Sequence, residues 1–204
     1  MRASFKIASL LLAIAASPAF ADGPKVSRLP GVPGQTPEAA RAGRPAGEDT
    51  INLTISRGHA PPVSAATGVL ARALRNDATT PRILRELTIM RTALFVKSDY
   101  EINQHIPMIK ACGYTDAKIE AVKNWRASSL FDERERALLA FVDQMLAGGD
   151  VDDPTFDTFS KHFTPKEIIE IAVTVSNYVA TGLYTNAIRL EIEKDGRQAF
   201  IGKC

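Results

Sequence analysis

Apolar residues recur every three or four positions through most of the chain after residue 50, which is the period of an amphipathic helix. The clearest series are Ile83, Leu87, Met90 and Leu94, then Leu138, Phe141, Val142 and Met145, and then Ile168, Ile171 and Val175. No long stretch alternates with period two, so strands are not expected. The pattern predicts helices over residues 49–57, 63–75, 81–96, 99–111, 116–125, 133–147, 154–161 and 165–193, the last with a possible break at Gly182. The predicted fold class is all-α, a compact multi-helix bundle.

Helix starts are marked by capping residues. An N-cap side chain stands before a proline in three pairs, which are Thr80 with Pro81, Asp153 with Pro154, and Thr164 with Pro165. A glutamate follows the cap by three residues in Asp132 with Glu135 and in Thr164 with Glu167. This spacing is the capping box, in which the two residues satisfy each other's free backbone amides.

The first 21 residues have the organisation of a secretory signal peptide. Arg2 and Lys6 precede an apolar run over residues 7–16, and Ala19, Phe20 and Ala21 form a small-x-small cleavage pattern. The run is about half of the roughly 20 residues that a spanning helix needs, so cleavage is favoured over an uncleaved anchor. We expect a mature chain beginning at Asp22 that is periplasmic or secreted, with no membrane association after the signal is removed.

Residues 22–48 are expected to form an extended arm, because they hold ten Pro and Gly in 27 residues and little apolar periodicity. Two interpretations remain open. The favoured one is a linker, and the other is a strap over a neighbouring subunit, anchored by Leu29 and Val32. Residues 49–204 then form one helical domain.

Charge excludes one class of function. The chain has 25 Lys and Arg against 23 Asp and Glu, and removing the two basic residues of the signal segment leaves the numbers equal. A binder of nucleic acid or of an anionic membrane needs a surplus of basic residues on one face. No nucleic-acid partner is therefore expected.

Metal and disulfide chemistry have few residues to draw on. The chain has three histidines and lacks the doubled Glu and His motif of helical di-iron proteins, so we predict no metal and no cofactor. His59 and His162 are read as structural or solvent-facing. Cys112 and Cys204 leave three possibilities: a bridge within the chain, a bridge between protomers, or a free buried Cys112.

The residues able to carry chemistry gather in the two predicted helices 81–96 and 99–111. Glu101 and His105 are four residues apart and share one face with Met108, while Glu86 lies in the preceding helix. Carboxylates buried beside an imidazole have pKa values pushed apart, which leaves one group protonated and another not near neutral pH. The alternative is a structural contact between helices, which is the commoner role of such a pair.

Four blocks of sequence resemble one known family. They are Arg57, His59 and Pro61; Arg85, Glu86 and Leu87; SDYEINQHIPMIKACG at residues 98–113; and Tyr184, Thr185, Asn186 and Ala187. Between about Asn52 and Glu193 the chain is similar to the carboxymuconolactone decarboxylase and alkylhydroperoxidase D superfamily. The resemblance implies an all-helical fold and a homotrimer or homohexamer.

The peroxidase branch of this superfamily has a Glu, eleven residues, a CxxC pair, three residues and a His. Glu86 and His105 fall on the Glu and the His, whereas Ser98 and Glu101 occupy the cysteine positions, and Tyr100 stands where a second His is frequent. A hydroxyl and a carboxylate cannot cycle between dithiol and disulfide, so thiol peroxidase activity is disfavoured. The decarboxylase branch is similar in having a Glu four residues before the His.

The sequence thus predicts cofactor-independent acid-base catalysis of the lyase or decarboxylase type on a small organic acid or lactone. His105 is the expected principal acid or base, Glu101 the group that fixes its tautomer or supplies a partner charge, and Glu86 the group reaching across from the preceding helix. Ser98, Tyr100, Tyr184 and Asn186 are the expected substrate contacts, the last two in a subunit-interface pocket if they are not core residues. The alternative from another class is a non-catalytic oligomeric protein that binds a ligand without turning it over.

Overall fold

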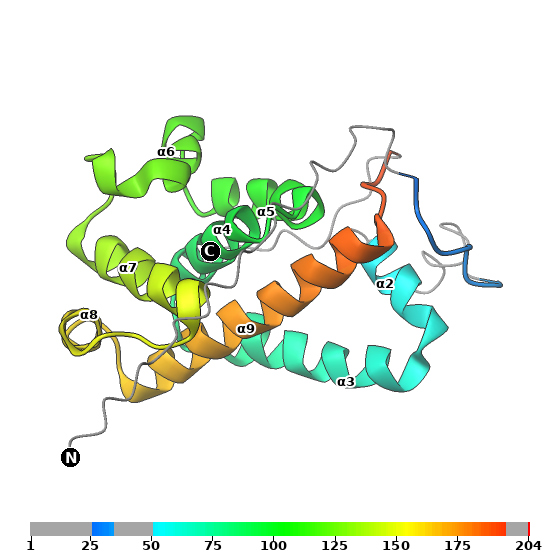
Figure 1. Ribbon diagram of the computed structural model, residues 1–204, viewed down its shortest axis with the longest axis horizontal. Coiled ribbons are helices and arrows are strands. Elements are labelled where there is room, and N and C mark those ends of the chain that lie inside the picture. The colour runs from blue at the N-terminus through cyan, green and yellow to red at the C-terminus, as the bar shows by residue number, and fades with distance from the viewer. Residues whose placement is uncertain (1–25, 35–50, 195–203) are drawn as a thin grey trace, which may run out of the picture.

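The computed structural model describes residues 26–34, 51–194 and 204, and every regular element within them is helical (Figure 1). The α-helices are α2 (Asn52–Ser56), α3 (Pro61–Arg72), α4 (Arg82–Phe95), α5 (Asp99–Ala111), α6 (Asp116–Ala121), α7 (Glu133–Gly148), α8 (Asp153–Ser160) and α9 (Pro165–Ile188). The 3-10 helices η1 (Arg57–His59) and η3 (Val122–Ala127) and the π-helix η2 (Ala73–Asp77) complete the series. The all-α prediction is confirmed.

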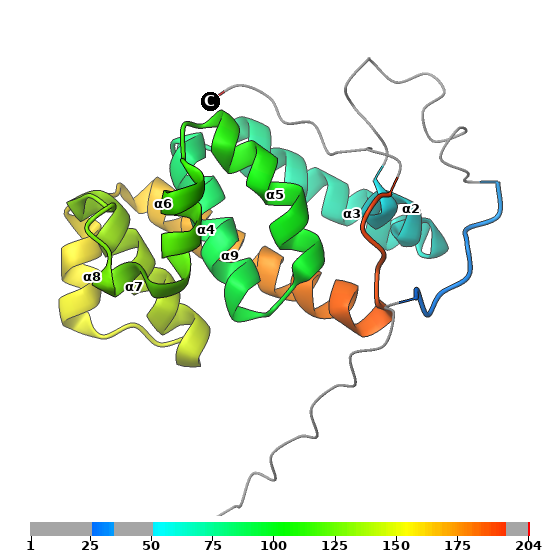
Figure 2. The ribbon, with the colours of Figure 1, turned by 90° about the horizontal axis from the view of Figure 1, so that it is seen from above.

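Helix α4 is the centre of the bundle. It packs against α5, α7 and α9, and Figure 2 shows it between α5 and α7 with α9 passing behind. Leu87 and Met90 of α4 meet Leu138 of α7 and Val175 of α9 in the fully buried core. These α4 positions belong to the three-and-four series that predicted the helix, so one sequence pattern specifies both the element and its buried face.

The predicted capping boxes are present at the starts of α7 and α9, where Asp132 and Thr164 exchange hydrogen bonds with Glu135 and Glu167. Two other predicted caps are wrong by one residue. Asp152, not Asp153, caps α8, because a proline is equally acceptable at the second helical position.

The second misplaced cap precedes α4, whose N-cap is Pro81 rather than Thr80. The Thr80 hydroxyl is used elsewhere, donating to Glu170 Oε2 at 2.7 Å, and the backbone N–H of Thr80 donates to the same atom at 2.8 Å. Glu170 lies on α9, so this threonine joins the start of α4 to a distant helix instead of capping its own.

Helix α9 is continuous to Ile188, so neither the predicted break at Gly182 nor the predicted end at residue 193 is correct. Arg189 takes a left-handed conformation, with φ of 53°, and ends the helix. Gly182 serves close packing instead: a Cβ at this position would lie 2.5 Å from Val96 Cγ2. The glycine therefore allows α9 to cross the end of α4.

The described part of the arm, residues 26–34, lies against its own chain. Arg28 donates through its backbone N–H to the Ile188 carbonyl at 2.9 Å and through Nη1 to the Ala187 carbonyl at 3.0 Å. His59 Nε2 lies 3.0 Å from the Pro30 carbonyl. The rest of the predicted arm and the whole signal segment, residues 1–21, fall outside the described residues.

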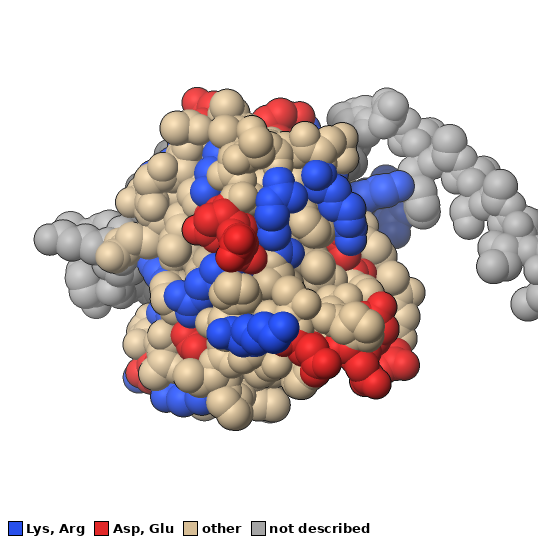
Figure 3. Space-filling view, turned by 90° about the vertical axis from the view of Figure 1, so that its left-hand side faces the viewer, with Lys and Arg blue, Asp and Glu red and all other residues tan. Residues whose placement is uncertain are grey.

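The surface drawn in Figure 3 carries basic and acidic side chains interspersed, without a field of one sign. This face is the end of the molecule that lies on the left in Figure 1. No described helix combines the length and the apolar character that crossing a bilayer requires.

Candidate active site

Helices α4 and α5 bring Glu86, Glu101 and His105 together. His105 Nδ1 lies 2.7 Å from Glu86 Oε2, and His105 Nε2 lies 3.6 Å from Glu101 Oε2. All three side chains are buried. Ser98 sets the start of α5, because its Oγ accepts a hydrogen bond from the Glu101 backbone N–H at 3.4 Å. The four-residue spacing in α5 then places Glu101 and His105 on one face.

Glu86 is held as a carboxylate. Burial would raise its pKa, but the nearby His105 and the hydrogen bond between them, together with Arg82 at 3.4 Å, lower the pKa below its ordinary value. The carboxylate accepts the Nδ1–H of His105, which fixes the tautomer that leaves Nε2 with its lone pair. Glu86 thus reaches across from α4 to the imidazole, as expected, and its shorter contact makes it the group that orients the ring, a role that the sequence assigned to Glu101.

The pKa of Glu101 is shifted in the opposite direction, above its ordinary value. Burial raises its pKa, and the charges of His105, Arg57 and Arg75 offset this only in part. Within the described residues its Oε1 has no hydrogen-bond partner, although only 2% of the residue is exposed. Near neutral pH Glu101 is thus more often protonated than an ordinary glutamate, and its acid proton can be given to a bound molecule.

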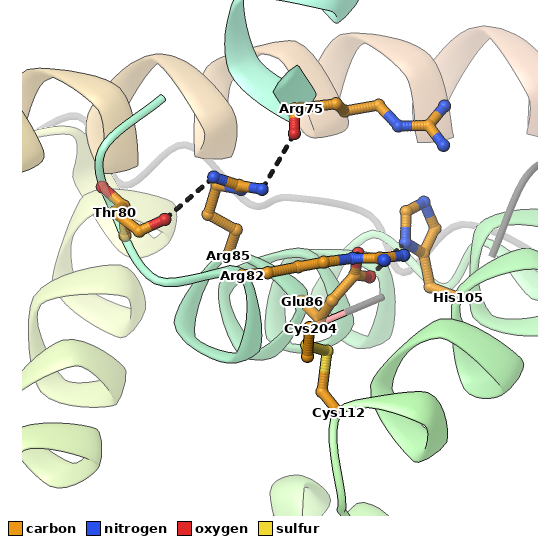
Figure 4. The surroundings of a disulfide bond; sticks show 8 residues. All are labelled: Arg75, Thr80, Arg82, Arg85, Glu86, His105, Cys112 and Cys204. Carbon is orange, nitrogen blue, oxygen red and sulfur yellow. Dashed lines mark hydrogen bonds and ion pairs between the residues drawn. A yellow bond between two sulfur atoms is a disulfide. The ribbon is translucent and has the colours of Figure 1, made fainter. Parts of the chain in front are cut away.

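A cavity of about 200 Å³ adjoins the cluster. Helix α5 lines it with Glu101, Gln104, His105 and Met108, and the other walls come from α2, η1, α3, η2 and α9. Glu86 does not line the cavity. It lies next to the imidazole, to which a dashed line joins it in Figure 4, so it can act on a substrate in the cavity only through His105.

Tyr178 of α9 closes one side of the imidazole. Its ring meets the His105 ring edge to face, with centroids 5.1 Å apart and planes at 82°. Burial raises the pKa of the Tyr178 hydroxyl, so this phenol stays protonated at all ordinary pH values. The contact limits rotation of the His105 ring.

None of the four predicted substrate contacts lines this cavity of the single chain, and the subunit-interface pocket expected for Tyr184 and Asn186 stays a prediction. Ser98 is buried beneath the start of α5, where its Oγ lies 3.3 Å from Thr185 Oγ1. Tyr100 donates to Glu193 Oε1 at 2.7 Å. Asn186 donates to the Val96 carbonyl at 2.9 Å and so joins α9 to the end of α4. Each of these side chains has a hydrogen-bond partner within the chain.

Tyr184 is the one of these four that reaches the cavity indirectly. Its hydroxyl accepts a hydrogen bond from Arg57 Nε at 3.0 Å, and Arg57 lines the cavity. The lining residues that the sequence did not assign to the site include Arg57, Arg75, Gln104, Asn177, Tyr178 and Thr181. Helical periodicity could have indicated Gln104, three residues after Glu101 on α5, whereas the others come from elements whose relative placement only the fold defines.

The two cysteines form a disulfide, which selects one of the three possibilities left open by the sequence. The bridge joins Cys112, at the end of α5, to Cys204, with the Cα atoms 5.1 Å apart (Figure 4). Neither cysteine lines the cavity. Among the described residues no three His, Cys, Asp or Glu side chains are arranged to hold a metal ion.

Fold and cluster together define an all-helical domain in which two central helices present an imidazole, flanked by two carboxylates, to a small cavity. Residues 61–144 match the model of the carboxymuconolactone decarboxylase family. This match covers less than half of the chain, and it supports the superfamily of carboxymuconolactone decarboxylase and AhpD-like proteins that the sequence resemblance indicated. A search of curated proteins found no match.

Solved structures share the fold. An Agrobacterium tumefaciens protein of unknown function, provisionally described as the antioxidant defence protein AhpD, is 21% identical over 69% of this chain and 97% of its own, with a TM-score of 0.64. A peroxidase-related protein with an AhpD core from Ralstonia eutropha JMP134 is 17% identical over 76% and 84%, with a TM-score of 0.66. The debrominase Bmp8, in a complex with 2,3,4-tribromopyrrole, is 22% identical over 71% and 78%, with a TM-score of 0.62. At such identities the similarity concerns the fold alone.

Proposed function

We propose that the protein is a cofactor-independent enzyme of the lyase or decarboxylase type that acts on a small organic acid or lactone by acid-base catalysis. The observation that carries this proposal is the arrangement of His105 between two buried glutamates at a cavity wall. The pKa of Glu86 is lowered and that of Glu101 is raised. Neighbouring groups whose pKa values are pushed apart supply both an acid and a base near neutral pH.

In this proposal each group has a part in proton transfer. Glu86 holds the Nδ1–H, so Nε2 keeps a lone pair that can take up a proton from solvent and pass it on. In the decarboxylation of a carboxylate, the electron pair of the broken C–C bond stays on the substrate when CO₂ leaves, and Glu101 supplies the one proton that the product needs. Glu101 is then reprotonated from solvent, with His105 Nε2, 3.6 Å away, as the relay.

The cavity favours a small substrate. Its volume of about 200 Å³ is below the roughly 300–1,000 Å³ that is typical of sites for drug-sized ligands. The debrominase with the same fold binds a small halogenated ring, which agrees with this range of ligand size. A binding protein without turnover would use the same cavity, but it would not need a proton-transfer pair buried at the wall.

Thiol peroxidase activity, the other alternative, is supported by one observation and opposed by two. The bridge shows that Cys112 and Cys204 are within bonding distance. However, neither lines the cavity, and at about 1.5 Å per residue Cys112 lies roughly 10 Å along α5 from His105. The proton-transfer cluster is therefore not placed to activate this thiol.

We propose further that the mature protein is periplasmic or secreted and assembles as a homotrimer or homohexamer. A disulfide suits an oxidising compartment. Assembly is supported by large apolar side chains exposed on α3 and α9, namely Val63, Val69, Ile169, Val173 and Leu183. No residue of α3 is buried within the single chain, so this helix has a face that a second copy can cover.

The test begins with a screen of small lactones and carboxylic acids for CO₂ release or ring opening. With an active substrate, His105→Ala should lower turnover by about 10²- to 10⁴-fold, the usual contribution of an acid-base residue. Glu86→Gln should lower turnover without unfolding the protein. His162→Ala, which changes a histidine far from the cavity, is the control. If His105→Ala and Glu86→Gln both leave turnover intact, the proton-transfer assignment is wrong.

A further inference from the structure

Two arginines line the cavity together with Glu101, and the proton-transfer mechanism uses neither. Arg57 belongs to η1 and Arg75 to η2, so they come from opposite ends of α3. Both lower the pKa of Glu101, which shows that their charges act on this carboxyl. A small cavity with two guanidinium groups is suited to an anion.

We propose that the cavity is a two-point site for a monoanionic carboxylic acid that also carries an uncharged carbonyl group. Arg57 and Arg75 hold the carboxylate, and the carboxyl group of Glu101, whose buried Oε1 has no partner among the described residues, donates a hydrogen bond to the carbonyl oxygen. The inference rests on the proposed function in one respect, since it takes this cavity to be the substrate site. It adds which ligands the cavity accepts and which it rejects.

Arg57 is held in place from α9. Its Nε donates to the Tyr184 hydroxyl at 3.0 Å, and its guanidinium carbon lies 5.6 Å from the centre of the Tyr184 ring. This hydrogen bond uses one of the five N–H donors of the guanidinium group, and the planar fork can still bind a carboxylate through two nitrogens. Tyr184 is therefore a positioning residue for the carboxylate site.

Arg75 is positioned by a local change in helix type. After Arg72 the chain widens into the π-helix η2, a feature that recurs at functional sites. Leu74 is buried against the core and fixes this turn. Arg85 of α4 fixes it from below, donating to the Arg75 carbonyl at 2.9 Å and to the Thr80 carbonyl at 2.8 Å. Figure 4 shows the Arg75 side chain extending from this anchor toward the side where His105 lies.

Glu101 sets the second point of recognition. Its buried Oε1 has no partner among the described residues, and a buried polar atom left unpaired is costly. A ligand carbonyl can accept the proton of the neutral acid and so satisfy the group. A second carboxylate at this point would instead face a buried acid and would have to lose its own hydration, so a dianion is disfavoured.

The proposal can be tested by titration calorimetry at pH 7 with three compounds that share the five-carbon chain of glutaric acid. Monomethyl glutarate has one carboxylate and one uncharged carbonyl, glutarate has two carboxylates, and dimethyl glutarate has none. Monomethyl glutarate should bind, with glutarate and dimethyl glutarate at least about tenfold weaker, a difference of about 1.4 kcal/mol. Equal binding of the three, tighter binding of glutarate, or no binding of the monoester at about 10 mM would overturn the proposal.

Substitutions test which residues bind the carboxylate of the monoester. Arg57→Gln and Arg75→Gln should each weaken monoester binding by about tenfold or more. Arg72→Gln is the matched control and should change nothing, because Arg72 is exposed on α3 and does not line the cavity. Tyr184→Phe should weaken the monoester several-fold without changing dimethyl glutarate, a charge-selective effect that loss of structure would not give. A drop for both ligands would contradict the positioning role.

Measurements of binding and of turnover distinguish failure of the two-point site from failure of the proposed acid-base function. His105→Ala should keep the preference of wild type for monomethyl glutarate over glutarate and dimethyl glutarate, because Arg57, Arg75 and Glu101, which give the preference, are all retained. If His105→Ala abolishes turnover but wild type binds the three probes equally well, the result supports the acid-base function and contradicts the two-point site. If the monoester preference is present and depends on the arginines while His105→Ala leaves turnover intact, the two-point site stands and the proposed mechanism falls.

Discussion

Glu101→Gln should make the protein more stable while making it less active. Glu101 is 2% exposed, and its Oε1 is unpartnered within the described chain. Burial raises its pKa, so folding resists the charged form that an unfolded glutamate adopts above its ordinary pKa of 4.5. The amide keeps the shape of the side chain and removes the ionisation. The glutamine amide is as buried as the carboxyl group, so only the cost of ionisation is removed, and we expect a gain of about 1–2 kcal/mol, within the range of ordinary stabilising substitutions.

The sign of the pH dependence follows from the raised pKa. In wild type, the contribution of neutral Glu101 is fully present below pH 4.5 and is lost as the pH rises through the folded-state value. Glu101→Gln does not lose this stability as the pH rises, because the glutamine side chain does not ionise. At about 2–4 °C per kcal/mol for a chain of this size, its Tm should exceed that of wild type by about 2–8 °C at pH 8 and by little at pH 4.5.

Glu86→Gln is the matched control, because the same change is made on the other side of His105. The pKa of Glu86 is lowered, so its contribution is present above pH 4.5 and is lost as the pH falls through the folded-state value. Losing this charge-assisted hydrogen bond should cost about 1.5–3 kcal/mol at neutral pH and little in acid. Scanning calorimetry from pH 4.5 to 8 compares both variants. A Tm of Glu101→Gln below wild type at pH 8 would refute the reasoning, because Glu101 would then be the ionised partner of His105.

Two further outcomes are expected. Peroxide consumption with a dithiol reductant should show no turnover in wild type or in Cys112→Ser, because the superfamily's CxxC positions hold Ser98 and Glu101; turnover that vanishes in Cys112→Ser would show that the bridge is redox-active. Light scattering at micromolar concentration should find a trimer or hexamer, and Leu183→Asp on the exposed face of α9 should shift it toward the monomer, whereas a wild-type monomer of about 20 kDa would exclude the proposed assembly.

The parts of the fold that the sequence could predict are those that local physics determines. Apolar spacing located the helices, and the boxes at Asp132 and Thr164 marked the starts of α7 and α9, because a cap needs only a neighbour three residues away. Thr80 and Gly182 were misread for the opposite reason. Thr80 bonds to Glu170, 90 residues later, and Gly182 packs on Val96, so their roles depend on tertiary contacts.

The same division runs through the candidate site. Four-residue spacing placed Glu101 and His105 on one face of α5, but spacing along one helix cannot decide which carboxylate reaches Nδ1, since Glu86 approaches from α4. That choice determines the chemistry. With Glu86 on Nδ1, the free Nε2 and the more readily protonated Glu101 both face the cavity, where a base and an acid are useful. Had Glu101 held the ring, the only carboxyl group among the described residues that line the cavity would have been used to orient the base, and Glu86, which does not line the cavity, could not have replaced it.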